Sequence, residues 1–213
     1  MKLFTRFYRT SPKAHLLLTQ LLLEVAIGLM LGDIHAEKPS AKHNTRLQFH
    51  HSQVQGFYLY HIFDLFKDYC GSVPFNASFY DARPNRMKTY FSVKFNTLSI
   101  PCFNLFRELF YDSSGVKFIP SNLGEYFTAR SLAYWFMDDG YKALNGYYFC
   151  TESFSDNDIN ILLALLRTKF NLSCSSHKTT NGLRIYINKK SIGEFNELIA
   201  PFILEGFAYK LHD

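Results

Sequence analysis

The sequence predicts an α+β protein made of two pseudo-symmetric halves, each with the element order αββαββα and one four-stranded antiparallel sheet. The main observation is an internal repeat. A hydrophobic, helix-like segment that ends in an aspartate occurs at 26–33 and at 132–139, so Asp33 and Asp139 lie half a chain apart in a sequence of 213 residues. Patterns of a strand, an amphipathic helix, a hairpin and a closing helix follow each aspartate in the same order. Such a duplication predicts packing about a pseudo-twofold axis, with the two motif helices at the centre.

The first half is predicted to span residues 15–118, after a basic leader at 1–14. The apolar run that starts at Leu16 is interpreted as a core helix, because polar residues interrupt it and no small-residue cleavage site follows it. Alternating polar and apolar residues then indicate strands, and apolar residues spaced by three and four indicate helices. The expected elements are a strand at 46–50, a helix at 54–66, a hairpin of strands 75–82 and 87–95, and a helix at 102–111.

The second half, residues 119–213, repeats this order with stronger local signals. Ser155 stands before an acidic stretch and is a good N-cap residue for a helix. Asn181-Gly182 is typical of a tight hairpin turn. The expected elements are a strand at 147–152, a helix at 159–170, a hairpin of strands 173–179 and 183–189, and a helix at 192–203.

Composition limits the class of protein. A hydrophobic content of 47% with 19% charged residues is typical of a globular chain, and no apolar run is long enough for a membrane span without a polar break. The net charge of +5 suits a polyanionic partner. Phe, Tyr, Ile, Leu, Asn and Lys have A/T-rich codons, and their abundance favours a gene from an organelle, with the mitochondrion preferred to the chloroplast.

The cysteines and histidines do not indicate a zinc site. The four cysteines lie at least 24 residues apart and form no C-x-x-C pair. His50 and His51 are adjacent on a predicted strand, so their side chains should point to opposite faces of the sheet and not share one ion.

The sequence context of the two aspartates favours metal binding over a purely structural role. Gly28 and Gly32 are spaced to let the first motif helix approach a neighbour closely. If the motif helices pack together, Asp33 and Asp139 emerge side by side, where the helix dipoles add to their negative charge. A single Asp beside Gly would more simply cap a helix or turn. The paired context instead predicts a divalent-cation site.

These motifs resemble those of the LAGLIDADG homing endonucleases, in the single-chain branch with two motifs that organellar introns typically encode. The resemblance covers about residues 20 to 212. Met137 and Leu31 stand at the first acidic position of the two motifs, Ile34 replaces the final glycine of the first, and Tyr134 replaces a motif glycine of the second. At Tyr134 the helix contact is therefore expected to be looser or to pack an aromatic ring. The second motif reads Leu132-Ala133-Tyr134-Trp135-Phe136-Met137-Asp138-Asp139-Gly140.

The resemblance implies a monomeric enzyme that binds a long double-stranded DNA target and breaks both strands, which promotes intron mobility. Asp33 and Asp139 would bind Mg²⁺, as two or three ions with Mn²⁺ able to substitute, and each active site would cut one strand. Lys117 and Lys210 match basic residues that lie beside the active sites in the family. A lysine beside a pentavalent phosphate would stabilise its charge, although alone each would be interpreted as a solvated surface charge.

The resemblance also implies that the two sheets form a saddle over the major groove. Arg46, Gln48 and His50 share one face of the first strand and are candidate base-reading residues. An ordinary polar sheet face is an equally good interpretation of any one of these residues. The remaining candidate DNA-binding residues are the hairpin cations Arg83, Arg86, Lys88, Lys94, Lys178, Arg184, Lys189 and Lys190.

Two alternatives stay open. An RNA maturase with the same fold would bind its host intron RNA and would not need both aspartates. A membrane-associated protein would use the basic leader and the stretch from Leu16 to Leu31 as its anchor, but that explains none of the repeat. Retention of Asp33, Asp139 and both lysines favours the nuclease, and no stable membrane association is expected.

Overall fold

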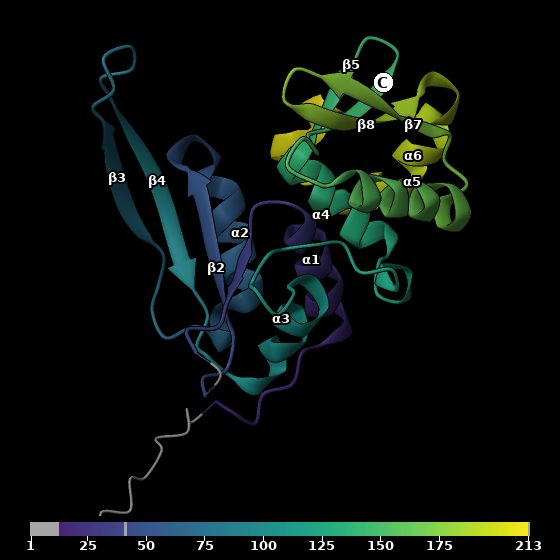
Figure 1. Cartoon of the computed structure of the whole chain (residues 1–213). Helices are drawn as coiled ribbons and strands as arrows, with labels where there is room; N and C mark the ends of the chain where they lie inside the picture. The colour runs from purple at the N-terminus through teal and green to yellow at the C-terminus, as the bar shows by residue number, and fades with distance from the viewer. Residues whose placement is uncertain (1–12, 41, 213) are drawn as a thin grey trace, which may run out of the picture.

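The computed structural model defines residues 13–40 and 42–212, so the expected basic leader lies outside the described residues except for its last two. It contains two four-stranded antiparallel sheets with the strand orders β1-β2-β4-β3 and β5-β6-β8-β7. The equivalent order of the two sheets confirms the duplicated α+β architecture. Figure 1 shows the sheets on either side of two central helices, α1 (Gln20–Leu31) and α4 (Ala129–Asp139).

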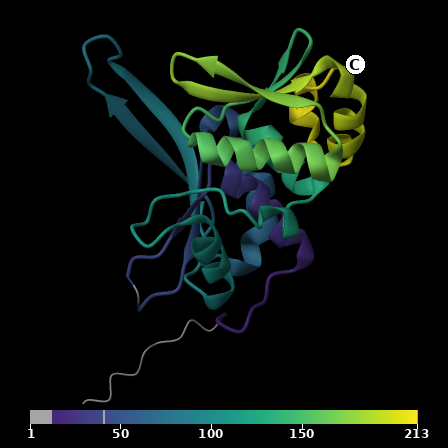
Figure 2. The ribbon, with the colours of Figure 1, turned by 45° about the vertical axis from the view of Figure 1, so that its right-hand side comes forward.

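Each half places its strands and remaining helices in the same succession. The first half contains β1 (His35–Glu37), β2 (Arg46–Ser52), α2 (Gly56–Phe66), β3 (Phe75–Asp81), β4 (Lys88–Asn96) and α3 (Asn104–Phe110). The second contains β5 (Gly140–Ala143), β6 (Gly146–Phe149), α5 (Asp156–Phe170), β7 (Cys174–Thr179), β8 (Gly182–Asn188) and α6 (Ile192–Ile199). Figure 2 shows α5 against the second sheet and the β3–β4 hairpin projecting away from the body. In the two described ranges, no helix has the length and apolarity needed to cross a membrane.

The two motif helices pack together as their glycines predict. A Cβ added to Gly28 would overlap the backbone oxygen of Ser131 on α4 and approach the Cβ of Tyr134 to 2.9 Å. The first helix therefore comes close enough that only hydrogen fits at this position. The aromatic ring expected at the replaced motif glycine is accommodated, because Tyr134 stands opposite Gly28 and its hydroxyl lies 2.8 Å from His61 Nε2.

Several element boundaries differ from the prediction for local reasons. Helix α1 begins at Gln20 rather than near Leu16, because the Thr19 hydroxyl accepts a hydrogen bond from the Leu22 N–H and caps the helix there. The helix predicted from 54 begins at Gly56, after a 3₁₀ turn at Gln53–Gln55. Val54 was expected on its apolar face and is instead 89% exposed.

Strand β6 is shorter than the predicted strand at 147–152. The ladder ends at Phe149, and the buried side chain of Thr151 then replaces backbone pairing. Its hydroxyl donates to the Leu183 carbonyl at 2.8 Å and accepts from the Ile185 N–H at 3.1 Å. A threonine hydroxyl thus satisfies the backbone groups of β8 that the shortened strand leaves unpaired.

Candidate active site at the ends of the paired helices

Asp33 and Asp139 lie at the C-terminal ends of the two packed helices. Asp33 follows the Gly32 C-cap of α1, and its side chain is 52% exposed. Asp139 is the last residue of α4 and lines a pocket of about 480 Å³ together with Lys210. Burial, followed by the negative charge of Asp33, raises the pKa of Asp139 to about 7. The ionised form of Asp139 is therefore disfavoured, because the surrounding positive charges do not offset its burial and the repulsion from Asp33.

Two lysines contact the backbone where the motif helices end. Lys210 is buried and donates to the Met137 carbonyl at 2.7 Å, in the last turn of α4. Lys117 donates to the Ile34 carbonyl at 3.4 Å, one residue after Asp33. Burial lowers the pKa of both lysines, and the nearby aspartates partly oppose that shift. Lys117 and Lys210 therefore both lie near the aspartates in this structure.

Asp138 is a third carboxylate at the same place. Its Oδ2 accepts a hydrogen bond from the Asp33 backbone N–H at 3.2 Å. A Cβ added to Gly32 would overlap the Asp138 carboxylate, so this side chain fills the space that the glycine leaves. Burial, and then the charge of Asp33, raises the pKa of Asp138 well above its usual range. Hydrogen bonds from the Asp33 backbone N–H and the Tyr58 side chain oppose this rise in the pKa.

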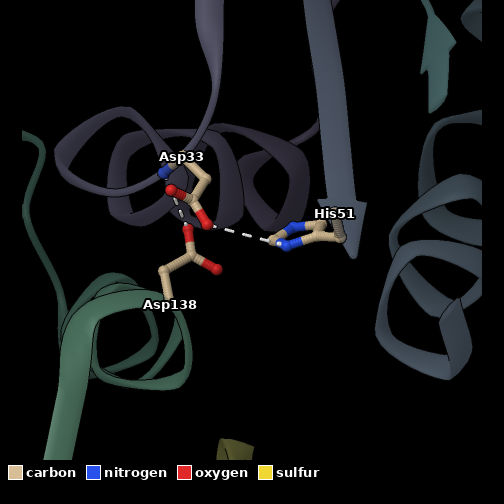
Figure 3. Close-up of side chains that lie close together, drawn as sticks. All are labelled: Asp33, His51 and Asp138. Atoms are coloured by element: carbon tan, nitrogen blue, oxygen red, sulfur yellow. Dashed lines mark hydrogen bonds and ion pairs between the residues drawn. The ribbon is translucent and has the colours of Figure 1, made fainter. Parts of the chain in front are cut away.

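His51 completes this group from the core-facing side of β2. Its Nδ1 lies 3.6 Å from Asp33 Oδ2, and its side chain is 2% exposed. Figure 3 shows Asp33, His51 and Asp138 pointing toward one another from α1, β2 and α4. One ligand-type atom from each lies within 4.8 Å of the other two. His50, the next residue on β2, is exposed on the other face, as the strand alternation predicts.

The first sheet carries its candidate DNA-binding residues on the face away from the core. Arg46, Gln48 and His50 alternate with buried residues along β2. Two of them are held by one carboxylate, because Glu37 pairs with Arg46 and accepts from Gln48 Nε2 at 3.0 Å. Lys94 stands directly opposite His50 on β4.

The tip of the first hairpin carries three of the predicted cations. Arg83 and Arg86 lie in the loop between β3 and β4, and Lys88 is the first residue of β4. Arg83 is paired with Asp81 at 2.5 Å, so its charge is partly neutralised in the free protein. The hairpin tip therefore presents to a polyanion one arginine that already has an ion-pair partner, Arg83, together with Arg86 and Lys88.

The second sheet distributes its predicted cations differently. Arg184 pairs across the strands with His177 on the open face, whereas Lys178 shares the opposite face with Leu183. The two candidate DNA-binding residues Lys178 and Arg184 therefore lie on opposite faces of this sheet, since adjacent strand positions alternate. Lys189 and Lys190 lie in a 3₁₀ turn after β8, because the strand ends at Asn188 and not at 189 as predicted.

The open face of the second sheet is mainly aromatic. Only cations were predicted to bind DNA on this sheet, so its aromatic residues were not expected. Tyr148 and Tyr186 are cross-strand neighbours with ring centroids 4.7 Å apart, and His177 stacks on Tyr186 at 4.7 Å. The Tyr148 hydroxyl is 2.8 Å from His177 Nδ1. Arg184 donates to the Tyr141 hydroxyl at 2.8 Å. The alternation of Arg184 and Tyr186 with two isoleucines along β8 is the sequence signal that could have predicted this surface.

Comparison with known proteins identifies the family. The sequence pattern of the LAGLIDADG DNA endonuclease family matches residues 23–195, which is most of the chain. The chain belongs to this family.

Relatives and solved structures agree with this membership. The DNA endonuclease I-ChuI of Chlamydomonas applanata is 31% identical over 213 residues, covering 92% of this chain and 96% of that protein. The cytochrome b mRNA maturase bI2 of Saccharomyces cerevisiae is 32% identical over 203 residues, which cover 89% of this chain but only 47% of the maturase. The structure of the homing endonuclease I-WcaI bound to its DNA recognition sequence is 28% identical, with a TM-score of 0.87 over 98% of this chain and 96% of that one. Structures of I-DmoI, 9% identical with a TM-score of 0.55, share the fold.

Within this LAGLIDADG chain the two motifs are not equivalent. Gly28 and Gly32 of the first motif correspond to Tyr134 and Asp138 of the second, because each pair has the spacing of Asp33 and Asp139. One helix therefore supplies both small residues and the other both large ones, and they meet at the interface. The Asp138-Asp139 doublet opposite a glycine was the sequence signal for this extra carboxylate.

Proposed function

We propose that this chain is a site-specific homing endonuclease that makes a double-strand break in a long DNA target by Mg²⁺-dependent phosphodiester hydrolysis, promoting the mobility of its intron. The observation that carries this proposal is the convergence of Asp33 and Asp139 at the ends of two packed helices, each with a lysine on the adjacent backbone. The likeness to I-WcaI, which is bound to DNA in its structure, supports it.

The aspartates have the properties needed to hold Mg²⁺. In the described part of the chain, the Asp139 carboxylate has no hydrogen bond and no ion pair, and it faces the pocket. Asp33 is half exposed, so it is open to a ligand. Carboxylate oxygens are the ligands that Mg²⁺ prefers. We propose two or three Mg²⁺ ions, with Mn²⁺ able to substitute; bound ions would stabilise the attacking and leaving oxygens of the phosphodiester.

The two lysines would assist by charge. Lys117 and Lys210 are held near the aspartates by backbone carbonyls, so placing them beside a phosphate requires little rearrangement. A fixed cation in a partly desolvated site stabilises the negative charge that develops on the phosphate oxygens. We assign Asp33 and Lys117 to the half at residues 15–118, and Asp139 and Lys210 to the half at 119–213. Each half would cut one strand.

The open faces of the two sheets are the proposed DNA surface. In the first half the contacts would come from β2 and the projecting hairpin, through Arg46, Gln48, His50, Arg83, Arg86, Lys88 and Lys94. In the second half Arg184 and its tyrosine neighbours share the equivalent face. Side chains on strands can read base edges in a major groove, where Arg and Lys pair with guanine and Gln pairs with adenine.

Cleavage of a DNA library by the purified full chain tests the proposal. Plasmids carrying randomised or host-exon inserts are incubated with Mg²⁺, and the ends of the products are sequenced. We expect linear products from one long site, and nicked circles from Asp33→Asn or Asp139→Asn. Unchanged linear product from either variant would contradict the assignment of the metal ligands.

An RNA maturase is the second candidate, because the yeast cytochrome b mRNA maturase is 32% identical over 203 residues. A pure maturase would bind its host intron RNA and leave the DNA library uncut. Either activity would place the protein with an organellar intron. We propose the mitochondrion as its location, in preference to the chloroplast.

A further inference from the structure

The open face of the first sheet carries a carboxylate on the surface that we assign to a polyanion. Glu37 is the last residue of β1 and stands directly opposite Arg46 on β2. Arg46 Nε donates a hydrogen bond to Glu37 Oε2, and Gln48 Nε2 donates to the same oxygen at 3.0 Å. One carboxylate oxygen therefore holds two of the candidate base-reading side chains.

Other arginines of the proposed DNA surface are held in the same way. Arg83 Nε donates to Asp81 Oδ1 at 2.8 Å. Arg184 Nε donates to Glu152 Oε1 on the second sheet. In the four strands of the first sheet the acidic residues are Glu37 and Asp81, and both pair with an arginine. This recurrence indicates that the carboxylates act on the arginines beside them.

The ion pair of Glu37 with Arg46 is too exposed to be explained by stability. The two side chains are 32% and 37% exposed. Exposed ion pairs contribute little to the free energy of unfolding, because water and salt screen them. A carboxylate on this face also repels phosphate groups and so lowers the affinity for DNA of any sequence. A role in recognition accounts for its position better than a role in folding.

The hydrogen bonds to Glu37 leave a reading edge on each side chain. Arg46 uses Nε, which leaves its two terminal nitrogens to donate to guanine O6 and N7. Gln48 uses one N–H of its amide, which leaves the carbonyl oxygen and the second N–H to pair with adenine. A side chain that is ordered before binding loses less conformational entropy on binding. It also disfavours bases that would require another orientation.

We propose that Glu37 is a positioning residue that orients Arg46 and Gln48 to read bases in the half of the DNA target over the first sheet. This inference rests on the proposed function, because it requires a specific duplex on that face. The charge of Glu37 weakens binding to every duplex, whereas its hydrogen bonds increase the difference in affinity between correct and incorrect bases. Specificity is such a difference, so a residue can improve it while it lowers affinity.

The base preferences of Glu37 variants test the proposal. The preferred site of the full chain is selected from a randomised duplex library in Ca²⁺, and Kd is then measured for that site and all its single-base variants. Glu37→Ala should reduce discrimination by about tenfold at neighbouring base pairs in one half of the site. It should also tighten binding to nonspecific duplex. Glu37→Gln loses the same charge but keeps an oxygen that accepts hydrogen bonds, so it should retain most of the discrimination.

Two further variants separate orientation from charge. Asp64→Ala removes a negative charge from α2, where Asp64 pairs with Lys67 in the same helix, and should leave the base preferences unchanged. Arg46→Lys keeps the positive charge but removes the planar fork, so it should lose discrimination at base pairs that Glu37→Ala also affects. Equal effects of Glu37→Ala and Glu37→Gln, or unchanged preferences in Glu37→Ala, would overturn the proposal. A wild-type chain without a preferred site would instead refute the proposed function itself.

A measurement without DNA tests the orientation of Arg46 directly. In the free wild type, ¹⁵N relaxation should show a rigid Nε–H group for Arg46, because this group donates to Glu37. The group should become mobile in Glu37→Ala and stay ordered in Glu37→Gln, and Arg46→Lys identifies its resonance. The backbone amide spectra of the same samples show that the variants are folded. A mobile Nε–H group in the wild type would contradict the proposal even if DNA cleavage confirmed the nuclease.

Discussion

Gly32 of the first motif helix lies against the carboxylate of Asp138 on the second, and no side chain larger than hydrogen fits between them. These two residues occupy equivalent positions of the two motifs and have very different sizes, so the interface is complementary rather than symmetric. The same residue that fills this space also accepts the Asp33 N–H and stands beside the proposed active site. Helix packing and the chemistry of the site are therefore coupled through one side chain.

The first prediction concerns this packing. Gly32→Ala should destabilise the protein by about 1–3 kcal/mol, the usual cost of overpacking. Asp138→Ala removes the carboxyl group that an added Cβ would overlap but keeps the Asp138 Cβ, which would lie 2.6 Å away, so the double variant should recover only part of the loss. Urea unfolding of the four proteins gives the coupling free energy as a double-mutant cycle.

Two other glycines provide the controls. At Gly28 the obstruction is the backbone oxygen of Ser131, so Tyr134→Ala should not rescue Gly28→Ala. Gly193 on α6 has no atom within 4 Å of an added Cβ. Gly193→Ala should be neutral or stabilising by about 0.4–1 kcal/mol. Simple additivity of Gly32→Ala and Asp138→Ala would contradict the proposed contact.

The second prediction is a pH dependence of stability. Burial and Asp33 raise the pKa of Asp139 from 3.8 to about 7, so between these values the folded state binds more protons than the unfolded state. The contribution of Asp139 to stability therefore falls as the pH rises through this window and stays unfavourable above it. Asp139→Asn removes the ionising group.

Thermal unfolding in EDTA measures this effect. Near pH 8, Asp139→Asn should unfold several degrees above the wild type, since about 1 kcal/mol shifts Tm by ~2–4 °C in a chain of this size. Near pH 4 the difference should largely disappear. A difference that is constant across this range would show that ionisation of Asp139 is not its cause.

The third prediction separates the two lysines. Lys117→Ala and Lys210→Ala should each slow single-turnover cleavage by about 10²-fold, as expected for loss of a fixed charge at the transition state. Affinity for DNA, measured in Ca²⁺, should change little. A large loss of affinity with normal cleavage at saturation would instead make that lysine a phosphate contact.

The two lysine substitutions should differ in their effects on the stability of the protein. Lys210 Nζ donates to the Met137 carbonyl at 2.7 Å, near the negative end of the α4 dipole, whereas the Lys117 contact with Ile34 is 3.4 Å long. Lys210→Ala should therefore lower the free energy of unfolding by about 1 kcal/mol, and Lys117→Ala by less. Equal losses in urea unfolding would contradict this order.

The fourth prediction concerns the DNA surface. Lys94 is on the open face beside His50, whereas Lys178 is on the opposite face of the other sheet. Lys94→Ala should weaken binding at low salt and reduce the slope of log K against log salt by about 0.9, the value for one phosphate contact. Lys178→Ala should leave the slope unchanged. The reverse result would place DNA on the helix-covered face.

The sequence by itself determined the duplicated architecture and indicated the principal members of the candidate site. Hydrophobic periodicity, the N-cap at Ser155 and the Asn181-Gly182 turn are local signals, and the structure has a helix that Ser155 caps and a hairpin that turns there. The spacing of Asp33 and Asp139 indicated that two motif helices pack together. Local patterns are sufficient for these features because backbone geometry fixes which residues share a helix or strand face.

Only the tertiary structure decided which side chains meet. His51 and Asp138 come from segments 87 residues apart, and no periodic pattern relates a strand position to the end of a distant helix. The shortened β6 depends in the same way on contacts between Thr151 and β8. Such juxtapositions arise from close packing of whole elements, where the small size of Gly32 admits Asp138 and the register of β2 turns His51 inward.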